Sequence, residues 1–152
     1  MDFYLVRHGE ALSESIDPRR PLTGLGRDNV EQLGREAAAR GVQVSEIFHS
    51  GILRAQQTAA ILAEVLQPSN GISERGGLRP EDDPSYAKAE LEIAARPVML
   101  VGHLPHMGRL AGYLAYDDPD RRIIEFAPAT MVCFSREDQV WKLSWVLARE
   151  SN

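Results

Sequence analysis

The sequence predicts an α/β protein, a three-layer α/β/α sandwich built on a mostly parallel sheet with an antiparallel edge. Apolar runs of strand length alternate with segments of helical periodicity as far as Ala115. Two strand-like segments then follow each other without an intervening helix, as in a hairpin at a sheet edge. The length is typical of one domain, so we expect residues 1–152 to form a single domain.

Two strand–helix units make up the expected first half of the chain. The expected elements are strand 3–6, helix 23–41, strand 42–48 and helix 53–66. Thr23 and Ser50 precede the two helices, and both are residue types that cap a helix N-terminus. Gly41 is a typical residue to end the first helix. The first strand is a short apolar run that Gly9 ends, which predicts that this strand is buried.

The second half repeats this pattern and then changes to a hairpin. The expected elements are a short strand in 72–78, helix 84–95, strand 97–101, a helix to residue 115, and hairpin strands 130–134 and 140–147. Pro105 suits the first turn of the fourth helix. Trp141, Leu143 and Trp145 alternate along the last strand, which predicts that they share one buried face.

Polar residues follow three of the expected strands. They are the pairs Arg7-His8, His49-Ser50 and Gly102-His103. Because the carboxyl ends of parallel strands meet at one edge of a sheet, we expect these side chains to converge. Arg54 lies in the first turn of the helix after the second strand, where the helix dipole also favours an anion.

The residue types at this edge are suited to phosphate. Two guanidinium groups, on Arg7 and Arg54, match phosphate oxygens through paired hydrogen bonds. A neutral imidazole between them, on His8, is a nucleophile able to take a phosphoryl group, and His103 can hold the transferring oxygens. Phosphoryl transfer requires mainly positioning and charge stabilisation, which these groups can supply without a metal or another cofactor.

Four motifs, in this order, resemble those of the histidine phosphatase superfamily, which has a phosphoglycerate-mutase-like fold. They are RHGE at 7–10, PLTGLG at 21–26, SGILRAQQTA at 50–59 and VGHLP at 101–105. The short stretch between the last two motifs is similar to that of the small bacterial branch, which dephosphorylates phosphohistidine on signalling proteins. The resemblance implies that His8 forms a covalent phosphohistidine intermediate and that Arg7, Arg54 and His103 bind the phosphoryl oxygens.

Two features depart from the family pattern. Gly51 stands where proline is common, and we expect it to loosen the loop without removing the site. The carboxylic acid that protonates the leaving group in larger members has no evident counterpart. Glu81, with Asp82 and Asp83, is a candidate by chain position, although this cluster is equally typical of a solvated loop. Glu10 is a candidate because it lies close to His8 in the sequence.

These observations predict a metal-independent phosphatase whose substrate is phosphohistidine in a partner protein. About 25 residues separate Ile72 from Pro97, too few for a cap over the site. A phosphatase of small phosphoesters is the alternative within the enzyme class. A mutase is disfavoured because the chain is short for the lid that keeps water out. An inactive phosphate- or phosphoprotein-binding domain is a third alternative, disfavoured because all four site residues are present.

Composition excludes several other classes. The net charge of -5 argues against nucleic-acid binding, and no apolar run approaches the length of a membrane span. Cys133 is the single cysteine and cannot form an internal disulfide. With no signal-peptide pattern, this favours a cytoplasmic location. We expect Cys133 to be buried in a strand, His106 to be a surface residue, and the acidic residues 117–120 to face solvent rather than a metal.

Overall fold

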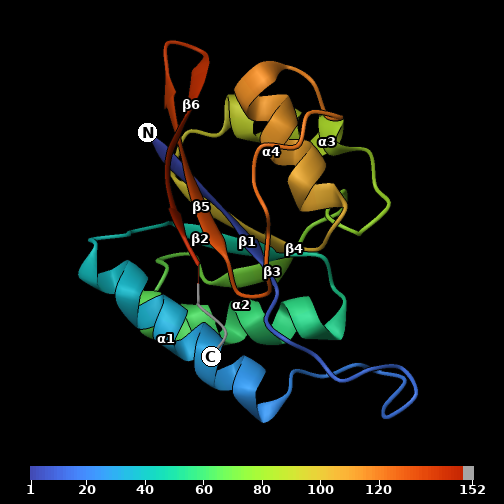
Figure 1. The fold of residues 1–152 in the computed structure, drawn as a ribbon. Helices are drawn as coiled ribbons and strands as arrows, with labels where there is room; N and C mark the ends of the chain where they lie inside the picture. The colour runs from blue at the N-terminus through green and yellow to red at the C-terminus, as the bar shows by residue number, and fades with distance from the viewer. Residues whose placement is uncertain (149–152) are drawn as a thin grey trace.

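The periodicity of the chain produces one six-stranded sheet with two helices on each face, as the computed structural model of residues 1–148 shows (Figure 1). The strands are β1 (Asp2–Arg7), β2 (Glu46–His49), β3 (Ile72–Glu74), β4 (Val98–Gly102), β5 (Met131–Glu137) and β6 (Val140–Leu147). The helices are α1 (Gly24–Ala39), α2 (Leu53–Leu66), α3 (Pro84–Ile93) and α4 (His106–Tyr116). The predicted fold class is confirmed.

The sheet is parallel through four strands and antiparallel at one edge. Its strand order is β3-β2-β4-β1-β5-β6. Strand β4 pairs in parallel with β1 on one side and with β2 on the other, while β5 and β6 are the antiparallel hairpin. All five residues of β4 are buried, because helices cover both faces of the sheet at this strand. The shortest strand, β3, lies at the opposite edge and is exposed.

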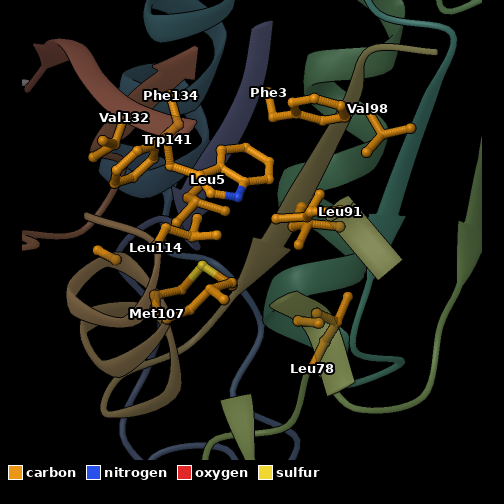
Figure 2. Close-up of a cluster of buried hydrophobic side chains, with 14 of the residues drawn as sticks. Phe3, Leu5, Leu78, Leu91, Val98, Met107, Leu114, Val132, Phe134 and Trp141 are labelled. Carbon is orange, nitrogen blue, oxygen red and sulfur yellow. The ribbon is translucent and has the colours of Figure 1, made fainter. Parts of the chain in front are cut away.

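Two hydrophobic cores fill the space between the sheet and its helices. Alternation along β1 directs Phe3 and Leu5 to the side of α3 and α4, as Figure 2 shows for this cluster. Tyr4 and Val6 face α1 and α2 on the other side. Each large side chain buried in this way contributes roughly 1.5–3 kcal/mol relative to an exposed one. Burial on both faces therefore holds β1 rigidly at the centre of the molecule.

The expectation that β6 buries one face is wrong. A β-bulge between Cys133 and Phe134 leaves one extra residue in β6, which reverses the side-chain alternation. Trp141 packs against the ring of Phe3, with ring centroids 5.4 Å apart, in the core beneath α4. Trp145 packs on the opposite face. Leu143, between them, is 42% exposed.

Two helix starts differ in their caps. Thr23 caps α1 as expected, because its Oγ1 accepts a hydrogen bond of 2.8 Å from the backbone N–H of Gly26. Ser50 does not cap α2, whose N-cap is Ile52. The chain makes a further turn after β2, through Gly51 at a φ of +86°, before the helix begins. This turn releases the Ser50 side chain for another contact.

Candidate active site

The register of the sheet brings the ends of β1, β4 and β2 together. Arg7 pairs with Gly102, and the backbone N–H of His8 donates to the Gly102 carbonyl at 3.0 Å. On the other side of β4, His49 pairs with Val101. The residues that directly follow β1, β4 and β2 are His8, His103 and Ser50, and the register therefore makes them neighbours at one edge of the sheet. The ring centroids of His8 and His103 lie 5.0 Å apart.

His8 is held as a neutral imidazole with one free nitrogen. Its Nδ1 lies 2.7 Å from the carbonyl oxygen of Gly9. Because a carbonyl only accepts, Nδ1 carries the hydrogen and Nε2 keeps its lone pair. Burial is the largest cause that lowers the pKa of His8, and with the nearby charges of Arg54 and Arg7 it brings this pKa to about 4. At neutral pH this imidazole is uncharged, and a lone pair of this kind is able to attack an electrophile.

His103 is almost fully buried and also neutral. Its Nε2 lies 2.6 Å from Oγ of Ser50, which itself accepts a hydrogen bond from the N–H of Ile52. Nδ1 of His103 has no hydrogen-bond partner within residues 1–148. Burial lowers the pKa of His103 to about 3, with smaller contributions from His8 and Arg54. If the Ser50 hydroxyl donates to Nε2, then Nδ1–H can donate to an oxygen of a ligand.

Three guanidinium groups supply positive charge to the same region. Arg7 donates from Nη1 to the Phe126 carbonyl at 2.7 Å, while the Nε atoms of Arg7 and Arg54 lack partners in the described part of the chain. Burial lowers the pKa of both guanidinium groups, and the charge of Arg20 lowers both further. Arg20 was missed by sequence reasoning, although it directly precedes the PLTGLG motif.

Thr58 is a second residue that sequence reasoning missed. Its Oγ1 accepts a hydrogen bond of 3.0 Å from the N–H of Gly9 and donates to the Arg54 carbonyl at 2.8 Å. This buried hydroxyl therefore ties the backbone next to His8 to the first turn of α2. The sequence signal was its position, one helical turn after Arg54 within the same motif.

The candidate acids occupy different surroundings. Asp82 accepts from the N–H of Arg79 at 2.9 Å, and Asp83 caps α3 by accepting from the N–H of Ser85 at 2.9 Å. These two carboxylates stabilise local structure. Glu81 is exposed. Glu10 is also exposed, and its carboxylate accepts a hydrogen bond of 3.2 Å from the Thr23 hydroxyl.

The expectation of a surface histidine at position 106 is wrong. His106 is fully buried, and neither ring nitrogen has a hydrogen bond of good geometry within the described residues. Burial lowers its pKa despite the nearby Asp82 carboxylate and the Gly77 carbonyl, which favour the charged form. His106 is the first residue of α4, and its buried side chain lies close to groups of the loop that precedes α3, among them Asp82 and Gly77.

The loop after β2 is built around Gly51. His49 Nδ1 accepts a hydrogen bond of 3.0 Å from the Gly51 N–H. A side chain at position 51 would overlap the Glu74 carboxylate, and a φ of +86° is closed to proline. Glycine is therefore required by this particular turn.

An open cleft of about 650 Å³ adjoins the site. It is lined by Leu104 and Pro105, next to His103, and by Phe126, whose carbonyl binds Arg7. Arg109 and Arg122 lie in its walls together with Asp120 and Glu125, and Arg109 pairs with Asp120 at 3.9 Å.

Two features of other protein classes are absent from residues 1–148. No helix there is long and apolar enough to cross a membrane. In the same residues, no three His, Cys, Asp or Glu side chains gather as a metal-binding group would. Cys133 is a buried strand residue, as expected.

Comparison with known proteins identifies the family. The model of the histidine phosphatase superfamily (branch 1) matches residues 3–80. An uncharacterized protein of Picosynechococcus sp. is 34% identical over 124 residues, which are 76% of this chain and 74% of that protein. The phosphohistidine phosphatase SixA of Escherichia coli is 28% identical over 119 residues, 75% of this chain and 74% of SixA.

Solved structures show the same fold. The protein histidine phosphatase SixA complexed with tungstate has a TM-score of 0.85 and 24% identity, covering 97% of each chain. A putative phosphohistidine phosphatase SixA from Agrobacterium tumefaciens has a TM-score of 0.80 and 22% identity, also over 97% of each chain. This likeness confirms the expected phosphoglycerate-mutase-like fold. From the family model and the relative at 34% identity, the chain belongs to the histidine phosphatase superfamily (branch 1) and is a hydrolase.

Proposed function

We propose that this protein is a metal-independent phosphatase that removes the phosphoryl group from phosphohistidine in a partner protein, through a covalent intermediate on His8. The observation that carries the proposal is the 2.7 Å contact of Nδ1 of His8 with the Gly9 carbonyl, which leaves the Nε2 lone pair free. Arg7 and Arg54 bind the equatorial oxygens of the phosphoryl group, and His103 donates to one of them from Nδ1.

The reaction has two displacement steps. In the first, Nε2 of His8 forms a bond to phosphorus while the bond from phosphorus to the substrate imidazole breaks. The other nitrogen of the substrate imidazole takes a proton from solvent before the bond breaks, so the ring leaves as a neutral imidazole. In the second step, water attacks phosphorus, the bond to His8 breaks, and inorganic phosphate is released. His8 returns to the neutral form that its low pKa, about 4, favours.

Two features support a substrate carried on a protein. Between β3 and β4 the chain forms only α3 and its loops, and α3 packs on α4 away from the ends of β1 and β4 (Figure 1). The cleft beside Arg7 and His103 is open, so a side chain on a protein surface can enter it. SixA of Escherichia coli, a relative of this chain, is named as a phosphohistidine phosphatase.

The alternative substrate is a small phosphomonoester. An alkoxide needs a proton as it leaves, so this reaction requires a carboxylic acid near the site. Glu10, two residues after His8 and hydrogen-bonded to Thr23, favours this alternative, and Glu81 is the second candidate. A protonated imidazole leaves more readily and depends less on either carboxylate.

The decisive experiment compares kcat/KM on a phosphohistidine-bearing domain with kcat/KM on a panel of sugar and nucleotide phosphates. We expect the phosphohistidine domain to be the better substrate, and Glu10→Gln and Glu81→Gln to retain that activity. A single small phosphoester preferred by a hundredfold, with its activity lost in either variant, would establish an ordinary phosphomonoesterase.

The intermediate is tested by quenching turnover of ³²P-labelled substrate. The label on the protein should be labile to acid and stable to base, and His8→Ala should lose both label and turnover. Full turnover in His8→Ala contradicts the mechanism. Chelators should have no effect, whereas vanadate, which mimics five-coordinate phosphorus, should inhibit. Loss of activity with chelator and its recovery with Mg²⁺ would contradict metal independence.

A further inference from the structure

The loop between β1 and α1, drawn in blue in Figure 1, is closed by its own hydrogen bonds and is bound to α2. The N–H of Leu12 donates to the Pro21 carbonyl at 2.9 Å, and Nε of Arg20 donates to the Leu12 carbonyl at 3.0 Å. The N–H of Leu22 donates to Oε1 of Gln57 at 2.8 Å. Gln57 follows Arg54 by three residues, so the two share a face of α2. This loop therefore presents Arg20 beside Arg54.

The backbone of Arg20 is in an unfavourable conformation. Its φ is +49°, in the left-handed region that glycine and asparagine adopt far more readily than arginine. The next residue is Pro21, which further restricts the backbone of the residue before it. A long charged side chain at such a position indicates that the side chain itself has a use.

The charge of Arg20 is not balanced within the described residues. Its neighbour Arg19 forms an ion pair of 3.0 Å with Asp17 on the surface, whereas Arg20 has no salt bridge in residues 1–148. Its guanidinium instead acts on the site: after burial, Arg20 is the next largest cause of the lowered pKa of Arg54, ahead of Arg7. The carboxylate of Glu14, in the same loop, offsets part of this repulsion at Arg54. An anion bound between the three guanidinium groups would offset the rest.

We propose that Arg20 is a third phosphoryl-binding residue, whose two Nη groups contact the oxygens of a doubly charged phosphoryl group held by Arg7 and Arg54. Its Nε is already bonded to Leu12, so the Nη groups are the donors directed to the ligand. This inference rests on the proposed function for the identity of the phosphoryl group, and the binding of inorganic phosphate tests it separately.

The test is the affinity of the full chain for inorganic phosphate and for vanadate, measured by calorimetry, with the melting temperature of each variant. Arg20→Gly removes the guanidinium and relieves the backbone. We expect an unchanged or higher melting temperature and a 10- to 100-fold weaker affinity, the range for losing one charged hydrogen-bond donor. Arg19→Gly is the matched control in the same loop and should bind both anions within about twofold of wild type.

Arg20→Asn and Arg20→Lys keep the test falsifiable if the glycine variant unfolds. Asparagine tolerates the left-handed backbone and should weaken binding like glycine, while lysine keeps the charge without the fork and should be intermediate. Wild-type affinity in a folded Arg20→Gly or Arg20→Asn variant, while Arg54→Ala loses binding, would overturn the inference. If wild type binds phosphate through Arg20 but hydrolyses no phosphohistidine, the proposed function fails and the inference stands.

Discussion

The Ser50 hydroxyl lies 2.6 Å from Nε2 of His103 and joins the loop after β2 to the end of β4. The same oxygen accepts from the N–H of Ile52 at 3.2 Å. If the Ser50 hydroxyl donates to Nε2, it selects the tautomer of His103 in which Nδ1 carries the hydrogen. In the proposed reaction Ser50 is a positioning residue, which acts through His103.

Ser50→Ala should lower kcat about fivefold with little change in KM, because one neutral hydrogen bond contributes roughly 1 kcal/mol to holding His103 in place. Steady-state kinetics on the proposed substrate measures this. Ser45→Ala is the control, since the buried Ser45 oxygen has no hydrogen-bond partner in residues 1–148. Equal kcat in the two variants would show that His103 does not depend on Ser50.

The buried imidazoles predict a specific pH dependence of stability. Burial lowers the pKa of His8 to about 4 and that of His103 to about 3, from 6.5 in the unfolded chain. Below pH 6.5 the unfolded chain takes up protons that the folded chain does not, so the free energy of unfolding falls as the pH falls toward 4. Each imidazole contributes up to about 1.4 kcal/mol per pH unit in this window, and nothing above it.

Denaturant unfolding at pH 7, 5.5 and 4.5 measures this slope, and His8→Asn should reduce it. NMR titration of the ring protons gives the two pKa values directly. A pKa near 6.5 for His8 would contradict its neutral, buried state.

Much of the fold could be predicted because the hydrophobic period and the length of a strand or helix depend only on residues that are close together in the sequence. Residues 97–101 could be assigned to a buried strand because the run is uniformly apolar and short. The convergence of Arg7, His8 and His103 on one edge needs only parallel strands with helical connections, which the order of elements implies. Ser50, Gly102 and their neighbours then become adjacent through the register.

The features that were missed depend on tertiary context. The β-bulge places Trp141 and Trp145 on opposite faces of the sheet, but the alternation of residue types along β6 gives no sign of it. The sequence does not distinguish a buried His106 from an exposed one. His106 is the first residue of α4, so no helical residue before it indicates which face of the helix it shares. Arg20 lies in an irregular loop, where no helical or strand periodicity predicts that its side chain comes close to Arg54. Only the closed hydrogen bonds of that loop bring the two together.

Thr58→Val should destabilise the protein and lower its activity. Valine keeps the shape of the side chain but leaves the buried N–H of Gly9 without an acceptor, at a cost of roughly 1–3 kcal/mol. Thr58→Ser keeps the hydroxyl and should retain most of the activity. Chemical denaturation and kcat/KM of both variants check this. Equal stability of the two variants would show that the hydroxyl is dispensable.

His106→Leu should be neutral or stabilising at pH 7 and more stabilising in acid. The buried ring has two nitrogens without good hydrogen bonds, so an apolar side chain of similar size removes an unfavourable burial of polar atoms. Because the pKa of His106 is lowered in the folded state, the unfolded wild-type chain takes up a proton below pH 6.5 that the folded chain does not, and the free energy of unfolding falls. The leucine variant has no proton to take up at this position and avoids this loss of stability in acid. Unfolding measured at pH 7 and pH 5 tests this. A large loss of stability at both values would indicate a hydrogen bond to His106.

Arg54→Lys should keep the fold and lose most of the rate. Lysine retains the positive charge at the start of α2, but its single ammonium cannot form the paired hydrogen bonds of a guanidinium. The Thr58 hydroxyl bonds to the backbone carbonyl of residue 54, so that contact survives the substitution. Loss of one transition-state donor typically lowers kcat on the order of 100-fold or more. Arg35→Lys, in an exposed ion pair with Glu31 on α1, is the control and should turn over at the wild-type rate. An Arg54→Lys variant with the kcat of this control would mean that charge alone, without the fork, suffices at this position.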